Sequence, residues 1–170
     1  MIEMRVMGIA LDTRTGSPIV VLNDKDNRKA LPIWIGSAEA SAIIRKIENI
    51  NSSRPMTHDL FLQIAEQSEY QIARVEINDV DDSTYFATIY MFNADLQKEL
   101  QIDSRPSDAI AIALRADVPI YVTDNVLATG LVSTDVEKDE QEAAEFKNFI
   151  QDIKPSDFEK LLKKNFESDQ

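Results

Sequence analysis

The chain has 170 residues, the size of one ordinary domain. It has no cysteine, which excludes disulfides, zinc–thiolate sites and thiol nucleophiles. It contains no apolar run of about 18 residues that would span a membrane, and residues 1–5 lack the basic-then-apolar form of a secretion signal, so we expect a cytoplasmic location. The net charge of -12 argues against broad nucleic-acid binding, so any such site must be a local basic pocket or must recruit cations.

The first part of the chain has the pattern of short strands separated by turns. Strands are predicted over residues 4–11, 19–22 and 30–35, and the turns between them are rich in Gly, Pro, Asp and Asn. Pro32 predicts that the third strand lies at a sheet edge or carries a bulge. Trp34 is expected to be a core residue rather than a base-stacking platform.

A helix is predicted after Gly36, because apolar residues recur there at helical spacing, namely at Ala40, Ile43, Ile44 and Ile47. Ser37 is expected to cap this helix, with Glu39 stabilised by the helix dipole. Alternatively, Ser37 and the free amides of the first turn bind an anion. A polar loop over residues 49–53 then leads to a second helix.

The remaining strands are predicted over residues 73–77, 84–92, 97–102 and 119–123, and residues 126–132 could extend the last one. Residues 109–113 are apolar on nearly every side, which predicts a buried helix. Strands and helices mix without strict alternation, which predicts an α+β fold: a single compact domain with a mixed, largely antiparallel sheet packed by helices. We divide the chain into this domain, residues 1–134, and an acidic C-terminal helical appendage, residues 135–170.

Two segments place an arginine and carboxylates beside a proline at an expected helix start: RPMTHDL at residues 54–60 and DSRPSDA at residues 103–109. A guanidinium can hold a phosphate with two parallel hydrogen bonds, and a carboxylate can hold a divalent cation or move a proton. If the segments meet in space, they form a site able to cut a phosphodiester. If they do not, they are helix caps, which the proline and the first-turn acid alone would explain.

The carboxylates of these segments are the expected metal ligands. Asp103 ends a strand and Asp108 lies one turn into the helix, so the two could position a metal ion, with Asp59 as a further ligand. Because oxygen ligands would dominate such a site, the expected metal is magnesium or manganese. Asp103 could instead form a structural ion pair with Arg105 or Arg54.

The cations and the histidine complete the expected site. Arg54, Arg105 and Ser107 are the expected phosphate-binding residues. His58, the only histidine, is expected to assist proton transfer and forms the catalytic set with Asp103 and Asp108. A lone histidine near a helix start is also commonly a capping or packing residue.

Four motifs in order, LPIWIG at residues 31–36, Glu39-Ala40, residues 54–60 and DSRPSDAIAIALR at residues 103–115, resemble the bifunctional nuclease domain family. The resemblance implies a compact α+β domain that forms homodimers or higher oligomers, and a nuclease that acts on DNA and RNA with a divalent metal. We therefore expect a metal-assisted phosphodiesterase of low sequence specificity. The alternative, favoured by the acidic charge, is a non-enzymatic oligomeric binding or regulatory domain.

Overall fold

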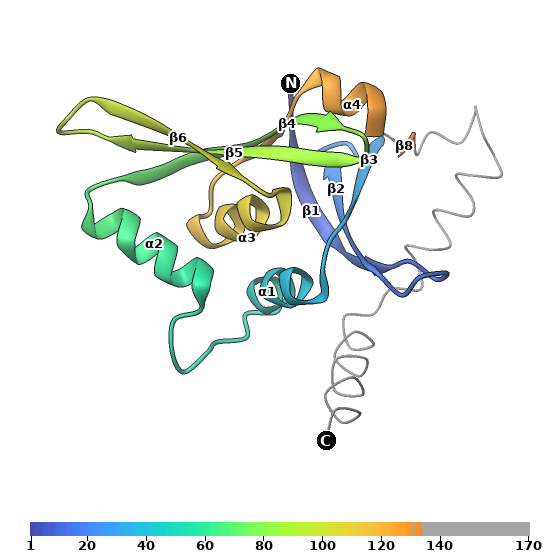
Figure 1. The fold of residues 1–170 in the computed structure, drawn as a ribbon, viewed down its shortest axis with the longest axis horizontal. Helices are drawn as coiled ribbons and strands as arrows, with labels where there is room; N and C mark the ends of the chain where they lie inside the picture. The colour runs from blue at the N-terminus through green and yellow to red at the C-terminus, as the bar shows by residue number, and fades with distance from the viewer. Residues whose placement is uncertain (131, 134–170) are drawn as a thin grey trace.

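The computed structural model describes residues 1–130 and 132–133, which form one mixed sheet with helices packed against it (Figure 1). The strands are β1 (Ile2–Leu11), β2 (Pro18–Asp24), β3 (Lys29–Trp34), β4 (Gln71–Asp81), β5 (Thr84–Asn93), β6 (Lys98–Ser104), β7 (Ile120–Val122) and β8 (Val132–Ser133). The helices are α1 (Ser37–Ile47), α2 (Thr57–Gln67), α3 (Pro106–Ala116) and α4 (Asp124–Gly130). The predicted α+β fold is confirmed.

The sheet consists of two antiparallel units joined through a short strand. The strand order is β6-β5-β4-β7-β1-β2-β3-β8, and only the pairing of β4 with β7 is parallel. Figure 1 shows the two units running in different directions, with α1, α2 and α3 together on one side of β4–β6. Helix α3 contacts both α1 and α2 and lies against β4 and β5, so it is the central helix of this layer.

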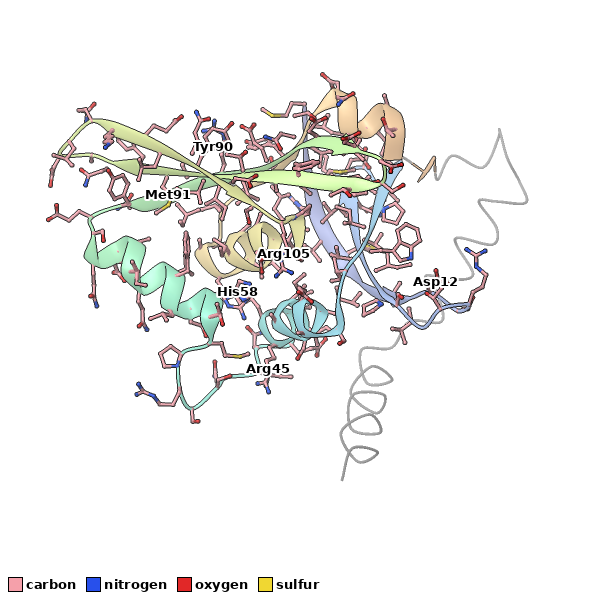
Figure 2. All side chains as sticks on the ribbon, in the orientation of Figure 1. Asp12, Arg45, His58, Tyr90, Met91 and Arg105 are labelled. Carbon is pink, nitrogen blue, oxygen red and sulfur yellow. The ribbon has the colours of Figure 1, made fainter. Side chains whose placement is uncertain are left out.

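The core lies between the helices and the inner face of the sheet. Along β5, Ile89 and Met91 are buried with Ile110 of α3, while Tyr90 belongs to the opposite face and carries the Arg74 guanidinium 3.7 Å from its ring centroid. Figure 2 shows Met91 on the helix side of the sheet and Tyr90 on the other. The period-2 alternation of a strand therefore divides β5 into a core face and an outer face.

Two sequence-based expectations for the elements are confirmed and one is wrong. Helix α3 is buried along most of its length, as predicted. Among the described residues, β8 pairs with β3 only at Lys29 and Ala30, so Pro32 lies on a part of β3 whose outer edge has no described partner strand. Residues 126–130, which could have extended the last strand, belong instead to helix α4, which buries Val126 and Leu127, while Val132 belongs to β8. A short apolar run does not distinguish a buried strand from a buried helix turn.

The division of the chain at residue 134 places the expected acidic appendage outside the described residues. Among the described residues, no helix is long and apolar enough to cross a membrane.

Candidate functional site

Four side chains from the starts of three helices form a connected polar group, here called the Arg105 cluster: Glu39, His58, Arg105 and Asp108. Arg105 Nε donates to Asp108 Oδ2 at 2.7 Å, and Arg105 Nη1 donates to Glu39 Oε1 at 2.7 Å. Asp108 Oδ1 lies 3.0 Å from His58 Nε2. Figure 2 shows Arg105 and His58 in the region where α1, α2 and α3 meet. The two Arg-Pro segments therefore do meet in space, through His58 and Asp108.

Local sequence places each group in the first turn of its helix. Arg105 is the extended N-cap of α3 and Pro106 is the first helical residue, which puts Asp108 in the first turn. Helix α1 begins after its N-cap Gly36, so the cap is not Ser37 as expected. A Cβ atom at Gly36 would overlap the Glu39 carboxylate. The glycine thus leaves room for Glu39 to fold over the helix start, where it meets Arg105.

The hydrogen bonds of the cluster favour the charged forms of Asp108 and Arg105. Burial pulls the pKa of Asp108 upward, but the hydrogen bonds with Arg105 and His58 outweigh burial and hold this pKa below its ordinary value. The hydrogen bond to Asp108, with the Asp108 charge and the bond to Glu39, raises the pKa of Arg105. Arg105 is 63% exposed, and among the described residues only two of its five N–H donors have a partner, so three remain for a ligand.

Arg105 opens onto a cavity of about 310 Å³, here called the Arg105 cleft. The cleft lies between the β3–α1 junction, the β4–β5 turn and the start of α3, and its lining includes Glu39, Ser107, Trp34 and Tyr85. The expectation that Trp34 is a core residue is wrong: it is 54% exposed, and its indole N–H donates to Asp12 at 3.2 Å. Tyr85 is partly buried against the core, so Trp34 is the exposed aromatic side chain beside the guanidinium, an arrangement that suits a nucleobase and its phosphate.

Asp103 lies apart from this cluster. It pairs with Thr88 across β5 and β6, while its neighbour Ile102 pairs with the buried Ile89. Directly opposed residues share a face of the sheet, so Asp103 belongs to the outer face, away from α3 and Asp108. The structure does not bring the two carboxylates around one point, because strand alternation turns the Asp103 side chain outward. The Asp103 side chain makes no hydrogen bond or ion pair within the described part of the chain.

Asp59 belongs to a second, more buried ion pair. Its Oδ2 accepts the backbone N–H of Met56 at 2.9 Å and its Oδ1 accepts Arg115 Nε at 2.8 Å. The Met56 hydrogen bond, with that of Arg115, holds the pKa of Asp59 below its ordinary value despite burial. Arg115 is only 8% exposed and also donates to the carbonyls of Ala111 and Ala42. Asp59 therefore caps α2 and ties it to α3 and α1.

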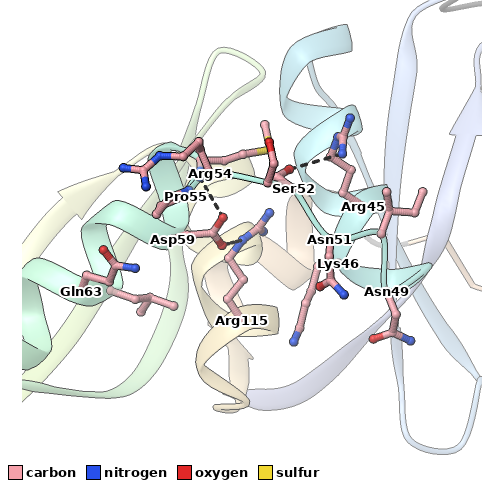
Figure 3. Close-up of a pocket in the computed structure, with 14 residues that line it drawn as sticks. Arg45, Lys46, Asn49, Asn51, Ser52, Arg54, Pro55, Asp59, Gln63 and Arg115 are labelled. Atoms are coloured by element: carbon pink, nitrogen blue, oxygen red, sulfur yellow. Dashed lines mark hydrogen bonds and ion pairs between the residues drawn. The ribbon is translucent and has the colours of Figure 1, made fainter.

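Arg54 lies in neither ion-pair group. It lines a separate cavity of about 460 Å³, here called the loop cavity, between the end of α1 and the start of α2 (Figure 3). Within residues 1–130 and 132–133, Arg54 forms no hydrogen bond or ion pair. The two expected phosphate-binding arginines therefore line different cavities, with Ser107 beside Arg105.

The expected metal ligands do not fit a metal ion in this arrangement. Both Asp108 oxygens are engaged by His58 and Arg105, and both Asp59 oxygens by Met56 and Arg115. Asp103 lies on the other face of the sheet. In the described ranges, no group of three His, Asp or Glu side chains is arranged to hold a metal ion.

The sequence does not predict the ion-pair partner of Glu39 or that of Arg115. Their partners Arg105 and Asp59 lie 66 and 56 residues away, and no local pattern reports such a contact. One signal is present in the spacing: Asp108 and Arg115 lie seven residues apart on α3, so they share the face that α1 and α2 cover.

Comparison with known proteins identifies the family to which the sequence is similar. A model of the bifunctional nuclease domain matches residues 20–135. An uncharacterized protein of Mycobacterium tuberculosis is 35% identical over 165 residues, which cover 92% of this chain and 97% of that protein. Bifunctional nuclease 2 of Oryza sativa subsp. japonica is 30% identical over 107 residues, 62% of this chain and 33% of the rice protein. Bifunctional nuclease 1 of Arabidopsis thaliana is 26% identical over 127 residues, 69% of this chain and 39% of the plant protein.

Proposed function

The chain belongs to the bifunctional nuclease domain family, and we propose that it hydrolyses phosphodiester bonds of DNA and RNA in the Arg105 cleft. One observation carries this assignment. The Arg105 guanidinium is fixed by two carboxylates at 2.7 Å each, yet it is 63% exposed and keeps three N–H donors for a ligand. The rice and Arabidopsis relatives are named bifunctional nucleases, which supports phosphodiester hydrolysis as the reaction class.

In the proposed reaction, Arg105 donates to the non-bridging oxygens of the bound phosphate and stabilises the charge that develops there. Glu39 Oε2 has no partner among the described residues and lines the same cleft, so it accepts the proton of the attacking water. The new bond between water oxygen and phosphorus forms as the bond to the leaving oxygen breaks, and the leaving oxygen takes a proton from solvent. Ser107, 6% exposed on the cleft wall, supplies a further hydroxyl donor.

His58 and Asp108 act through Arg105 rather than on the substrate. The His58 side chain is 12% exposed and lines neither the Arg105 cleft nor the loop cavity. It holds Asp108, which in turn fixes the guanidinium plane. We therefore assign His58 as a positioning residue. Trp34 offers an exposed aromatic face that accepts any base, which accounts for low sequence specificity.

We propose that the reaction requires a divalent cation, and the assay varies which cation is present. The two carboxylates and one guanidinium of the Arg105 cluster carry a net charge of about -1, which opposes phosphate binding unless a cation offsets it. The cluster carboxylates are already hydrogen-bonded, so we assign no step to a metal. Activity is to be measured with Mg²⁺, with Mn²⁺ and with a chelator.

The decisive experiment is the Arg105→Gln variant on single-stranded DNA and RNA. Loss of the guanidinium should lower kcat/KM about 100-fold or more, as for other preorganised transition-state donors. Arg105→Lys keeps the charge but not the two-donor fork and should remain strongly impaired. Lys98→Gln, an exposed charge change on β6, is the matched control. Native rates in a folded Arg105→Gln protein would rule out the cleft as the site of hydrolysis.

A second candidate function is a non-enzymatic, oligomeric nucleic-acid-binding or regulatory domain. The observation that favours it is that Asp59, Asp108 and His58 are all engaged in interactions within the fold. In that case, oligonucleotides bound to the protein would be recovered intact with every metal tested. Light scattering of the same samples would report the dimer that the family resemblance implies.

A further inference from the structure

We propose that the loop cavity is a second phosphate-binding site, which holds the backbone of a single-stranded substrate on one side of the Arg105 cleft. This inference rests on the proposed function for the identity of the strand, but the binding site itself can be tested without turnover. The cavity of about 460 Å³ is formed by the end of α1, the loop that follows and the start of α2 (Figure 3).

The first observation is the charge of the lining. Residues 1–134 contain 12 lysines and arginines and 19 aspartates and glutamates. An average part of the surface is therefore expected to carry a net negative charge. Four of those cations line this one cavity, namely Arg45, Lys46, Arg54 and Arg115, whereas Asp59 is its only acid. The chain thus concentrates positive charge at this position against its overall balance, as an anion site requires.

The second observation is that the acid is already neutralised. Asp59 accepts Arg115 Nε at 2.8 Å and the Met56 N–H at 2.9 Å, and Arg115 is buried. The cavity therefore presents the other three cations, a net charge of about +3 at neutral pH. The side chains of Lys46 and Arg54 have no hydrogen bond or ion pair in the described chain, and the only partner of the Arg45 side chain there is the Ser52 hydroxyl, at 3.4 Å.

The third observation is that carbonyls at the end of α1, beside the cavity, are already hydrogen-bonded. The chain leaves α1 through Asn49, which is left-handed at φ 54. The Asn49 N–H donates to the Lys46 carbonyl and the Ile50 N–H to the Arg45 carbonyl, the pattern of a Schellman motif. Because these carbonyls are satisfied, the cavity wall offers donors instead, from the side chains of Asn49, Asn51, Ser52 and Ser53.

The ligand class follows from where the two cavities lie. Glu39 lines the Arg105 cleft at the start of α1, and Lys46 lines the loop cavity at its end. Seven residues of helix separate them, which is about 10 Å along the axis at 1.5 Å per residue. A nucleic-acid strand advances about 3.4 Å per nucleotide, so about three nucleotides would join the two sites. A strand lying along α1 can therefore place one phosphate at each end.

The test is binding of fluorescent dinucleotides and octanucleotides of DNA and RNA to the full chain, by anisotropy, in chelator to prevent turnover. The native protein should bind the octanucleotide more tightly than the dinucleotide. The double variant Lys46→Gln/Arg54→Gln should lose most of that gain. Between about 50 and 200 mM salt, its slope of log K against log salt should shrink by about 1.4, or 0.7 for each lost phosphate contact. Lys25→Gln/Lys98→Gln, an equal charge change at exposed positions outside both cavities, should behave as native.

Three results would overturn the inference. These are an unchanged octanucleotide affinity in the cavity variant, an equal loss in the Lys25→Gln/Lys98→Gln control, or competition by inorganic phosphate as strong as by the octanucleotide. The last would identify a free-phosphate site instead of a strand site. Because none of these measurements needs cleavage, failure of the nuclease proposal would show in the Arg105→Gln assay and leave this test intact.

Discussion

Gly36→Ala should separate the orientation of Arg105 from the stability of the fold. Gly36 has φ -78 and ψ 164, a region open to alanine, so the backbone does not resist the change. The new Cβ overlaps only the Glu39 carboxylate, the far end of a flexible side chain, which would swing away and release Arg105 Nη1. The variant therefore removes one of the two anchors of the guanidinium without a cavity or an unpaired buried group.

The expected magnitudes differ widely between stability and rate. Alanine is a poorer N-cap than glycine by about 0.5–1 kcal/mol, and its lower unfolded-state entropy offsets about 0.4–1 kcal/mol. The Glu39–Arg105 pair is exposed on the arginine side and contributes about 0.2–1 kcal/mol. The unfolding free energy should thus change by less than about 1 kcal/mol, while a misplaced guanidinium lowers kcat/KM about 10- to 100-fold.

The assay pairs urea unfolding with hydrolysis of single-stranded DNA. Gly8→Ala is the control, because a Cβ at Gly8 meets nothing within 4 Å and should leave both quantities unchanged. Glu39→Gln should show a similar rate defect, and the double variant Gly36→Ala/Glu39→Gln should lose little more than either alone. Native rates in Gly36→Ala, or fully additive defects in the double variant, would refute the reasoning.

Further predictions concern the second ion pair, acid stability and the exposed tryptophan. Asp59→Asn should lower the unfolding free energy by about 2 kcal/mol, less than for a fully buried pair because Asp59 is 39% exposed. Asp124→Asn, at an exposed pair with the N-terminus, should cost under about 0.5 kcal/mol in the same urea titration. Asp59 and Asp108 have a lowered pKa in the fold, so their stabilisation is complete above the unfolded pKa of about 3.9 and is lost as pH falls through the folded pKa. The urea concentration at the unfolding midpoint should therefore decrease when the pH is lowered below about 4. This decrease should be smaller in Asp59→Asn. Trp34 is the only tryptophan and lines the Arg105 cleft, so octanucleotide binding should quench its emission. Binding seen by anisotropy with no change in that emission would place the strand elsewhere.

The sequence predicts the elements whose periodicity is long enough to be read locally. Alternation over residues 73–77 and 84–92 gives β4 and β5, and the apolar run of residues 109–113 gives the central helix α3. It fails where a choice depends on distant packing. Residues 126–132 are apolar enough for a strand, but contact with β4 and β3 makes most of them a helix. Trp34 follows buried strand residues, yet it lies at the strand end, where the sheet no longer covers it.

The candidate site shows the same division. The sequence identifies Arg105 and Asp108, which are three residues apart and form an ion pair within one helix start. It does not predict that Asp103, five residues before Asp108, lies on the opposite face of the sheet. The intervening strand end decides this, since each residue of β6 changes face and the register with β5 is fixed by Ile102 opposite Ile89.

The two Arg-Pro segments have similar letters and different physical roles, and exposure explains the difference. Asp59 and Asp108 both lie in a first helical turn, and both accept an arginine. The partner of Asp59, Arg115, is 8% exposed with its other donors on backbone carbonyls, so that pair can only hold helices together. The partner of Asp108, Arg105, is 63% exposed with donors to spare. Only the second pair keeps free donors for a phosphate, so we assign the proposed chemistry to the segment at residues 103–109. The segment at residues 54–60 positions it through His58, while its own Arg54 faces the loop cavity.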